Sequence, residues 1–101
     1  MLWRDVIHLI AQVDGENEMG DPTTADGDPR QVYANKKSVR QSEFYQAAMV
    51  GLRPELMFEV RTVEYQGEPK LEYDGKEYRI IRTYEKDSET IELICAGLVS
   101  D

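Results

Sequence analysis

The second half of the chain alternates between apolar and polar residues with a period of two, which is the pattern of β-strands. Residues 55–96 contain four such runs separated by short polar turns, and the last run places Ile91, Leu93 and Cys95 on one face. Asp74-Gly75 between two of the runs is a strong hairpin signal, because a type I′ turn needs positive φ at both central residues. The pattern therefore predicts a β-meander over residues 55–96, and short strands at this spacing are typical of a small barrel or sandwich.

Two further strands are predicted before the meander. Asp5 to Val13 is apolar on both faces, with Ile7 and Leu9 on one face and Val6, His8 and Ile10 on the other. A strand of this kind is expected to be covered on both sides, by the core and by a second surface. A shorter strand is expected over residues 31–35.

A helix is predicted over residues 42–50, between these strands and the meander. Ser42 is a plausible N-cap, and Phe44 and Ala48 lie at helical spacing. Gly51 suits the position after the helix, where the backbone commonly takes positive φ. Because a helix of two or three turns is not stable alone in water, it is expected to pack on the sheet through Phe44 and Ala48.

The charge of the chain is concentrated in residues 14–29. This segment contains no Lys or Arg, and its six acids carry −6 of the net charge of −8: they are Asp14, Glu16, Glu18, Asp21, Asp26 and Asp28. Glycine and proline are frequent in it, and Met19 is its one large apolar residue. Since such a segment cannot bury enough surface to offset its ordering entropy, it is predicted to be a long mobile loop.

Length and charge limit the classes of protein that the sequence fits. A chain of 101 residues fits one small domain over residues 1–101. The net charge of −8 disfavours a protein that binds nucleic acid by neutralising phosphates, and it disfavours docking on an anionic membrane. One Cys excludes an internal disulfide, and the first residues do not resemble a signal peptide, so an intracellular, reducing compartment is expected.

No set of residues predicts catalysis, a cofactor or a metal site. The sequence has no glycine-rich phosphate-binding motif, and one His and one Cys cannot supply a zinc site. His8 is expected to be a structural histidine and Cys95 a small buried residue. The acidic segment lacks the ligand spacing and flanking helices of an EF-hand, so a specific calcium site is not predicted.

Several residues are candidates for contacts with other chains. An exposed Trp3 near the start of the chain would mark such a contact. Lys36, Lys37, Arg40 and Arg53 bracket the predicted helix, and they fit either an acidic partner or ordinary solvated charge. The candidates for subunit or partner contact are Trp3, Val6, His8, Ile10, Phe44 and Tyr45.

The order of these segments resembles the phage head–tail adaptor family, whose members are also called head-completion, stopper or head–tail joining proteins. The resemblance rests on Arg30-x-Val32-Tyr33-Ala34-Asn35, Ser42-Glu43-Phe44-Tyr45-Gln46-Ala47, Gly51-Leu52-Arg53-Pro54, Leu71-Glu72-Tyr73-Asp74-Gly75-x-x-Tyr78-x-Ile80 and Glu92-Leu93-x-Cys95, in this order. It covers the chain from about Trp3 to Cys95. The ordered combination is more specific than any one of its parts.

The resemblance implies a mainly β protein, a small antiparallel β-barrel of about six strands with one short helix and a long mobile loop. It also implies a virion protein, assembled in the host cytoplasm, whose copies form a ring below the portal and adaptor and above the tail proteins. Such a ring closes the DNA channel and passes DNA without sequence-specific binding. The acidic segment 14–29 would reach the channel or a neighbour.

Two other functions fit the same sequence. One is a β-barrel that binds another protein without catalysis, and the other is a tail-completion rather than a head-completion subunit. A small hydrolase or nucleotide-binding enzyme is disfavoured, because the sequence offers no set of acid, base and nucleophile.

Overall fold

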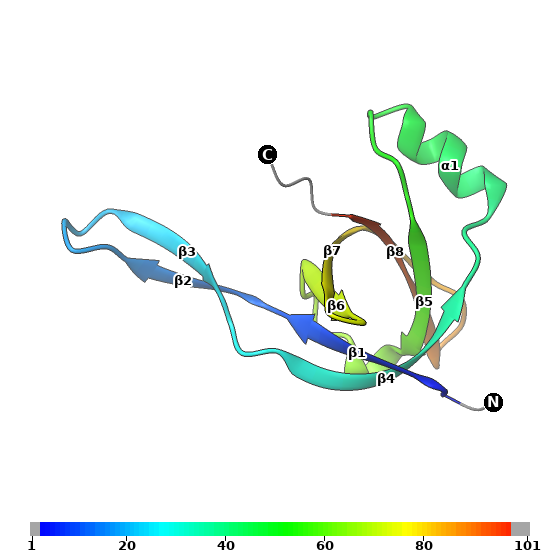
Figure 1. Ribbon diagram of the computed structural model, residues 1–101, viewed down its shortest axis with the longest axis horizontal. Coiled ribbons are helices and arrows are strands. Elements are labelled where there is room, and N and C mark those ends of the chain that lie inside the picture. The colour runs from blue at the N-terminus through cyan, green and yellow to red at the C-terminus, as the bar shows by residue number, and fades with distance from the viewer. Residues whose placement is uncertain (1–2, 98–101) are drawn as a thin grey trace.

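Six antiparallel strands form a closed barrel in the computed structural model, which describes residues 3–97 (Figure 1). In order around the barrel the strands are β1 (Asp5–Ile10), β4 (Arg30–Lys37), β5 (Leu56–Arg61), β8 (Thr90–Gly97), β7 (Lys76–Glu85) and β6 (Lys70–Tyr73). Every neighbouring pair is antiparallel. This confirms the prediction of a mainly β chain with a small antiparallel barrel.

The barrel interior holds the apolar face of each alternating run. Its buried residues are Ile7, Leu9, Val32, Ala34, Phe58, Val60, Leu71, Ile91, Leu93 and Cys95. Phe58 is fully buried and its ring meets that of Tyr73 edge-on, with the ring centroids 5.0 Å apart. Alternate residues of a strand point to opposite faces, which is why a period of two in the sequence fills one interior.

The predicted type I′ turn is present between β6 and β7. Asp74 has a φ of 52° and Gly75 a φ of 78°, and Tyr73 pairs with Lys76 across the turn. Further along, a bulge between Ile80 and Arg82 shifts the register of β7 against β8. A bulge increases the local twist of a strand, which helps a small sheet to close.

The N-terminal strand is shorter than predicted. β1 ends at Ile10, which pairs with Lys70 in the last pair between β1 and β6, and β2 (Gln12–Glu16) begins after Ala11. The chain leaves the barrel at this point because the partner strand ends there. The remaining bounds also differ slightly, since β4 extends to both sides of the predicted segment 31–35.

The prediction of a structureless loop over residues 14–29 is wrong. Gln12–Glu16 (β2) pairs with Pro22–Asp26 (β3) as an antiparallel hairpin, which we call the arm (residues 12–26). Its backbone groups pair across the two strands, and at the tip Asn17 Oδ1 accepts hydrogen bonds of 2.9 Å from the amides of Met19 and Asp21. Hydrogen bonds therefore hold these two strands together, although every residue of β2 and β3 is exposed to solvent.

The helix α1 (Gln41–Ala48) lies outside the barrel, and the 3-10 turn η1 (Thr62–Glu64) follows β5. The predicted anchors are wrong: Phe44 is 46% exposed and Ala48 is exposed, whereas Glu43 and Ala47 are buried. Ser42 is inside the helix and does not cap it. After the helix Gly51 has a φ of 77°, as predicted.

The cause is an electrostatic contact that a hydropathy pattern does not show. Arg82 Nε lies 3.2 Å from Glu43 Oε2, so a charged side chain of α1 faces the barrel wall in place of the aromatic one.

Within residues 3–97 the chain has no helix that is long and apolar enough to cross a membrane.

Candidate interaction surfaces

The arm is the most exposed part of the molecule and extends to one side of the barrel (Figure 1). The six acids that the sequence singled out lie on it or beside it, all exposed: Asp14 and Glu16 on β2, Glu18 and Asp21 at the tip, Asp26 on β3, and Asp28 between the arm and β4. Met19 at the tip is 86% exposed. The arm is therefore not part of the core, and it remains a candidate for contact with another chain.

The root of the arm is fixed to the barrel. Lys70 Nζ lies 2.7 Å from Asp26 Oδ2 and 3.2 Å from Glu77 Oε1, and the hydrogen bond to Asp26 raises the pKa of Lys70. The amide of Gly27 donates to the carbonyl oxygen of Ala11 at 2.7 Å. These contacts set the direction in which the arm leaves the barrel.

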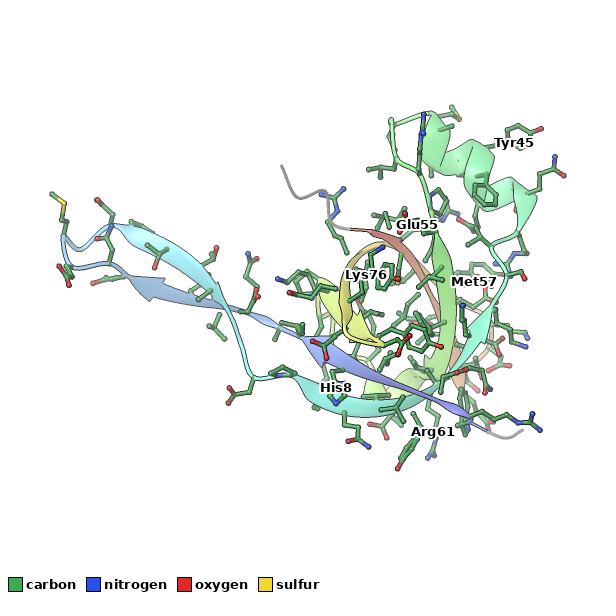
Figure 2. The ribbon with its side chains drawn as sticks, viewed as in Figure 1. His8, Tyr45, Glu55, Met57, Arg61 and Lys76 are labelled. Carbon is green, nitrogen blue, oxygen red and sulfur yellow. The ribbon has the colours of Figure 1, made fainter. Side chains whose placement is uncertain are left out.

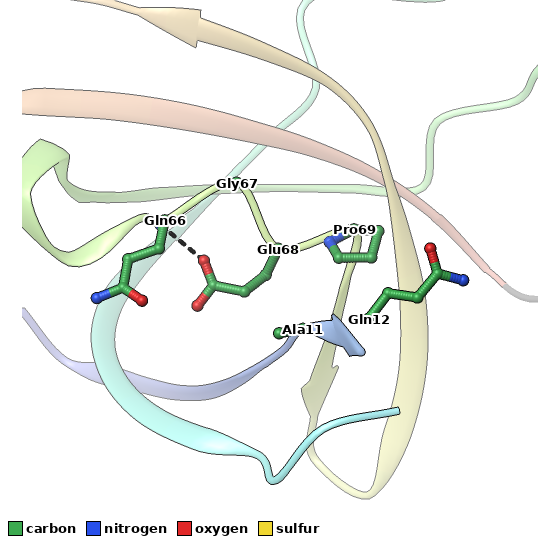
Figure 3. A pocket seen from close by; sticks show the side chains of 6 residues that line it. All are labelled: Ala11, Gln12, Gln66, Gly67, Glu68 and Pro69. Atoms are coloured by element: carbon green, nitrogen blue, oxygen red, sulfur yellow. Dashed lines mark hydrogen bonds between the residues drawn. The ribbon is translucent and has the colours of Figure 1, made fainter. Parts of the chain in front are cut away.

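A hollow of about 360 Å³ lies beside this root (Figure 3). Its main charged group, Glu68, is 4% exposed and already occupied: the amide of Gln66 donates to its Oε1 at 2.7 Å, and Arg30 pairs with its Oε2. Its other lining residues are Ala11, Gln12, Gly67 and Pro69. The hollow therefore lies at the junction of the arm and the barrel, and each oxygen of the Glu68 carboxylate already has a partner within the chain.

The outer face of β1 is only partly the apolar patch that the sequence predicted. Val6 is 38% exposed, but Ile10 is 4% exposed and cannot contact another chain (Figure 2 labels His8 between them). Val6 pairs with Tyr33 of β4, which is 59% exposed, so the two strands together present an apolar pair. Sequence reasoning missed Tyr33 because it depends on which strands are neighbours.

Trp3 is partly exposed. It lines a hollow of about 480 Å³ with residues of β5, η1 and the loop before β8. Arg61, which Figure 2 labels, and Val63 belong to the same hollow. Trp3 therefore remains a candidate for contact with another chain.

α1 and the residues directly after it carry exposed apolar side chains. Tyr45 is 66% exposed and points away from the barrel (Figure 2), and Met49 and Val50, which follow the helix, are 82% and 71% exposed. Phe44 adds a fourth exposed apolar side chain. The structure thus places the two predicted contact residues of this helix, Phe44 and Tyr45, on its surface.

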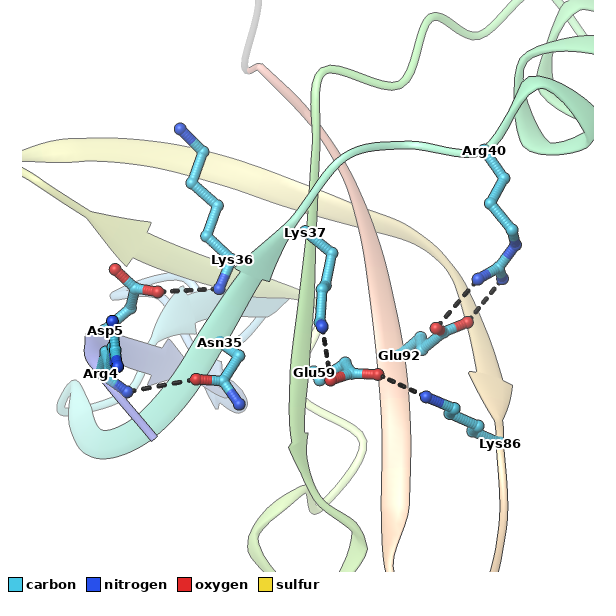
Figure 4. A network of polar contacts seen from close by, with 9 residues as sticks. All are labelled: Arg4, Asp5, Asn35, Lys36, Lys37, Arg40, Glu59, Lys86 and Glu92. Atoms are coloured by element: carbon cyan, nitrogen blue, oxygen red, sulfur yellow. Dashed lines mark hydrogen bonds and ion pairs between the residues drawn. The ribbon is translucent and has the colours of Figure 1, made fainter. Parts of the chain in front are cut away.

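Two buried carboxylates form an ion-pair cluster on the outer barrel wall (Figure 4). Glu59 is 1% exposed and lies between Lys37 and Lys86, at 3.6 and 3.1 Å. Glu92 is 2% exposed and pairs with both terminal nitrogens of Arg40, one of them at 3.0 Å. The hydrogen bonds from Arg40 lower the pKa of Glu92, and the same pair raises the pKa of Arg40.

Sequence reasoning missed this cluster. Glu59 and Glu92 alternate with core residues and so resemble the solvated face of a strand. Their burial depends on Lys37, Arg40 and Lys86, which come from distant parts of the chain. The one feature of the sequence that pointed to these ion pairs was the group of cations around the predicted helix, which includes Lys37 and Arg40.

Cys95 is the single cysteine of the chain. Cys95 lies inside the barrel, where burial raises the pKa of its thiol to about 12, so it is not a nucleophile at neutral pH. Among residues 3–97 no three His, Cys, Asp or Glu side chains come together as a metal site.

A comparison with protein families matches residues 3–97 to the phage head completion proteins. The chain belongs to the phage head completion protein family. The match spans the barrel, the arm and α1, so it includes every surface described above. Head completion proteins are structural proteins of the virion, at the junction of head and tail. A comparison with curated proteins found no match to the chain.

Proposed function

We propose that this head completion protein forms a ring below the portal and adaptor, joins them to the tail, and helps to close the DNA channel. The proposal rests on the arm. This acidic hairpin has paired strands, yet none of the residues in those strands is buried within its own chain. A hairpin that contributes nothing to its own core is expected to act on a second molecule.

The surfaces of the barrel suit head-to-tail assembly. A ring is built when one patch of a subunit meets a different patch of the next subunit. The arm supplies one patch, and the exposed apolar residues of α1 or of the Val6–Tyr33 pair supply candidates for the other. Because these patches differ in charge and position, an open or closed series of copies is favoured over a two-fold dimer.

The charge of the chain suits a channel through which DNA passes. The net charge is −8, and most of it lies on or beside the exposed arm. Negative charge near DNA repels the phosphates, so a ring of these subunits would let DNA pass without sequence-specific binding. The role is structural, and we assign no catalytic step to it.

The proposal is tested by electron microscopy of the cognate portal–adaptor assembly, with and without the purified chain. We expect a ring of added density at the channel exit. Density on the tail instead would favour a tail-completion subunit. Absence of added density on either structure would contradict the proposal.

A further inference from the structure

A groove of about 260 Å³ separates α1 from the barrel wall. Its apolar lining consists of Ala47, Val50 and Leu52 on the helix side and of Ile81 and Ile94 on the wall. The groove can take one apolar side chain of moderate size, because the volume of a large aliphatic residue is well below that of the groove.

Beside the groove, on the same wall, lies an open hollow of about 420 Å³. Arg40, Arg82 and Lys86 line it, and their side chains are 45%, 45% and 50% exposed. Two carboxylates, those of Glu43 and Glu92, also line the hollow, but both residues are buried. The accessible charge in the hollow is therefore positive, although the chain as a whole is strongly negative.

The groove and the hollow form one surface, since Glu43 and Arg82 line both. This surface fits an extended segment that carries an apolar side chain next to carboxylates. The apolar side chain would enter the groove, and the carboxylates would lie against the half-exposed cations.

The tip of the arm has this composition. Met19 is 86% exposed and is flanked in sequence by Glu16, Glu18 and Asp21, all exposed. The hydrogen bonds from the tip amides to Asn17 hold the turn in shape, so less ordering is needed on binding. A flexible thioether side chain also adapts well to an irregular apolar groove.

The arm and α1 lie at opposite ends of the molecule (Figure 1), so the tip that reaches the groove must come from a second copy. The paired strands of the arm span roughly 13 Å at about 3.3 Å per residue, and the turn at the tip extends beyond them. The molecule measures 47 Å along its longest axis, which runs along the arm in Figure 1, and 30 and 26 Å along the other two. The arm therefore projects beyond the barrel, where it can reach a surface of an adjacent copy.

We propose that the groove between α1 and the barrel wall is the receptor for the arm tip of the neighbouring copy, with Met19 in the groove and the tip acids against Arg82, Arg40 and Lys86. The inference rests on the proposed function, because it supplies the contact between adjacent subunits of the ring. Each copy gives its arm to one neighbour and receives the arm of the other, which is a head-to-tail interface.

Disulfide trapping between two variants tests this contact. One chain carries Met19→Cys and the other carries Val50→Cys, and the two are mixed in equal amounts under mild oxidation, alone at high concentration and on the portal–adaptor assembly. Cys95 can stay in both chains, since it is fully buried. The matched control replaces Val50→Cys by Val63→Cys, a residue of η1 that is 76% exposed and does not line the groove.

We expect the Met19→Cys and Val50→Cys mixture to give about tenfold more disulfide-linked dimer than the control mixture, and the yield to fall with added salt. Equal yields, or no disulfide-linked dimer in either condition, would overturn the inference. Electron microscopy of the same samples separates the two proposals: a ring without this disulfide contradicts only the arm contact, whereas absence of any ring contradicts the proposed function as well.

Discussion

Glu92 is a buried carboxylate whose charge depends mainly on one partner, Arg40. Replacing Arg40 by Gln leaves that charge poorly paired, and we expect the free energy of unfolding at neutral pH to fall by about 1–3 kcal/mol. The estimate is below that for a fully buried pair because the Arg40 side chain is 45% exposed. Urea unfolding measures the change, with Arg79→Gln on the exposed part of β7 as the matched control.

The same pair predicts a dependence on pH. Arg40 lowers the pKa of Glu92 in the folded chain, so the pair stabilises the fold above the ordinary carboxyl pKa of 4.5. This contribution is lost as the pH falls through the lowered value. The difference in stability between the natural chain and the Arg40→Gln variant should therefore be largest near pH 7 and shrink below about pH 4.5. A difference that grew on acidification would refute this assignment.

Cys95 gives a second prediction for a single side chain. Because the thiol is fully buried and burial raises its pKa to about 12, it should not react with an aromatic disulfide reagent in the native chain at pH 8. Reaction should appear only after unfolding in denaturant, at the stoichiometry of one thiol per chain. Rapid labelling without denaturant would show that the barrel interior opens at this strand.

The hairpin between β6 and β7 depends on a turn that only certain residues adopt. Gly75 has a φ of 78°, so Gly75→Ala should destabilise the chain by about 1 kcal/mol. Gly15→Ala on the arm is the matched control, since the added Cβ would meet only Thr23 Oγ1 at 3.8 Å. Thermal unfolding of the two variants should show a lower midpoint for the first and little change for the second.

The arm should be separable from the barrel. Every residue of β2 and β3 is exposed, so replacing residues 14–24 by a short turn should change the free energy of unfolding by less than about 1 kcal/mol. Denaturant unfolding tests this, and circular dichroism shows whether the barrel remains folded. A shortened chain that failed to fold would mean that the arm is part of the folding unit.

The barrel elements were predictable from the sequence, while the arm and the orientation of α1 were not. Runs such as Ile91, Leu93 and Cys95 place apolar residues on one face, and Asp74-Gly75 marks a turn, so local patterns were sufficient. The arm is held by backbone pairing and by Asn17, which leave no pattern of hydropathy. The burial of Glu43 depends on Arg82, which is far away in sequence.

For the molecule as a whole, the family match places the chain among the structural proteins of the head–tail junction. The closed barrel pairs its strand edges within the chain, so the arm and the outward-facing side chains are the surfaces that we propose for assembly. The contact candidates Val6, Phe44 and Tyr45 were expected from the sequence to face other chains, and all three are exposed. The groove beside α1 had no signal in the sequence, because β7, β8 and α1 form it together.

The account predicts that assembly on the portal requires the arm. Native mass spectrometry of the portal–adaptor assembly measures this directly, once with the full chain and once with the chain in which residues 14–24 are replaced by a short turn. The full chain should add one fixed integer multiple of its mass of 11.6 kDa, and the shortened chain should add none. Equal added mass from both chains would contradict the account.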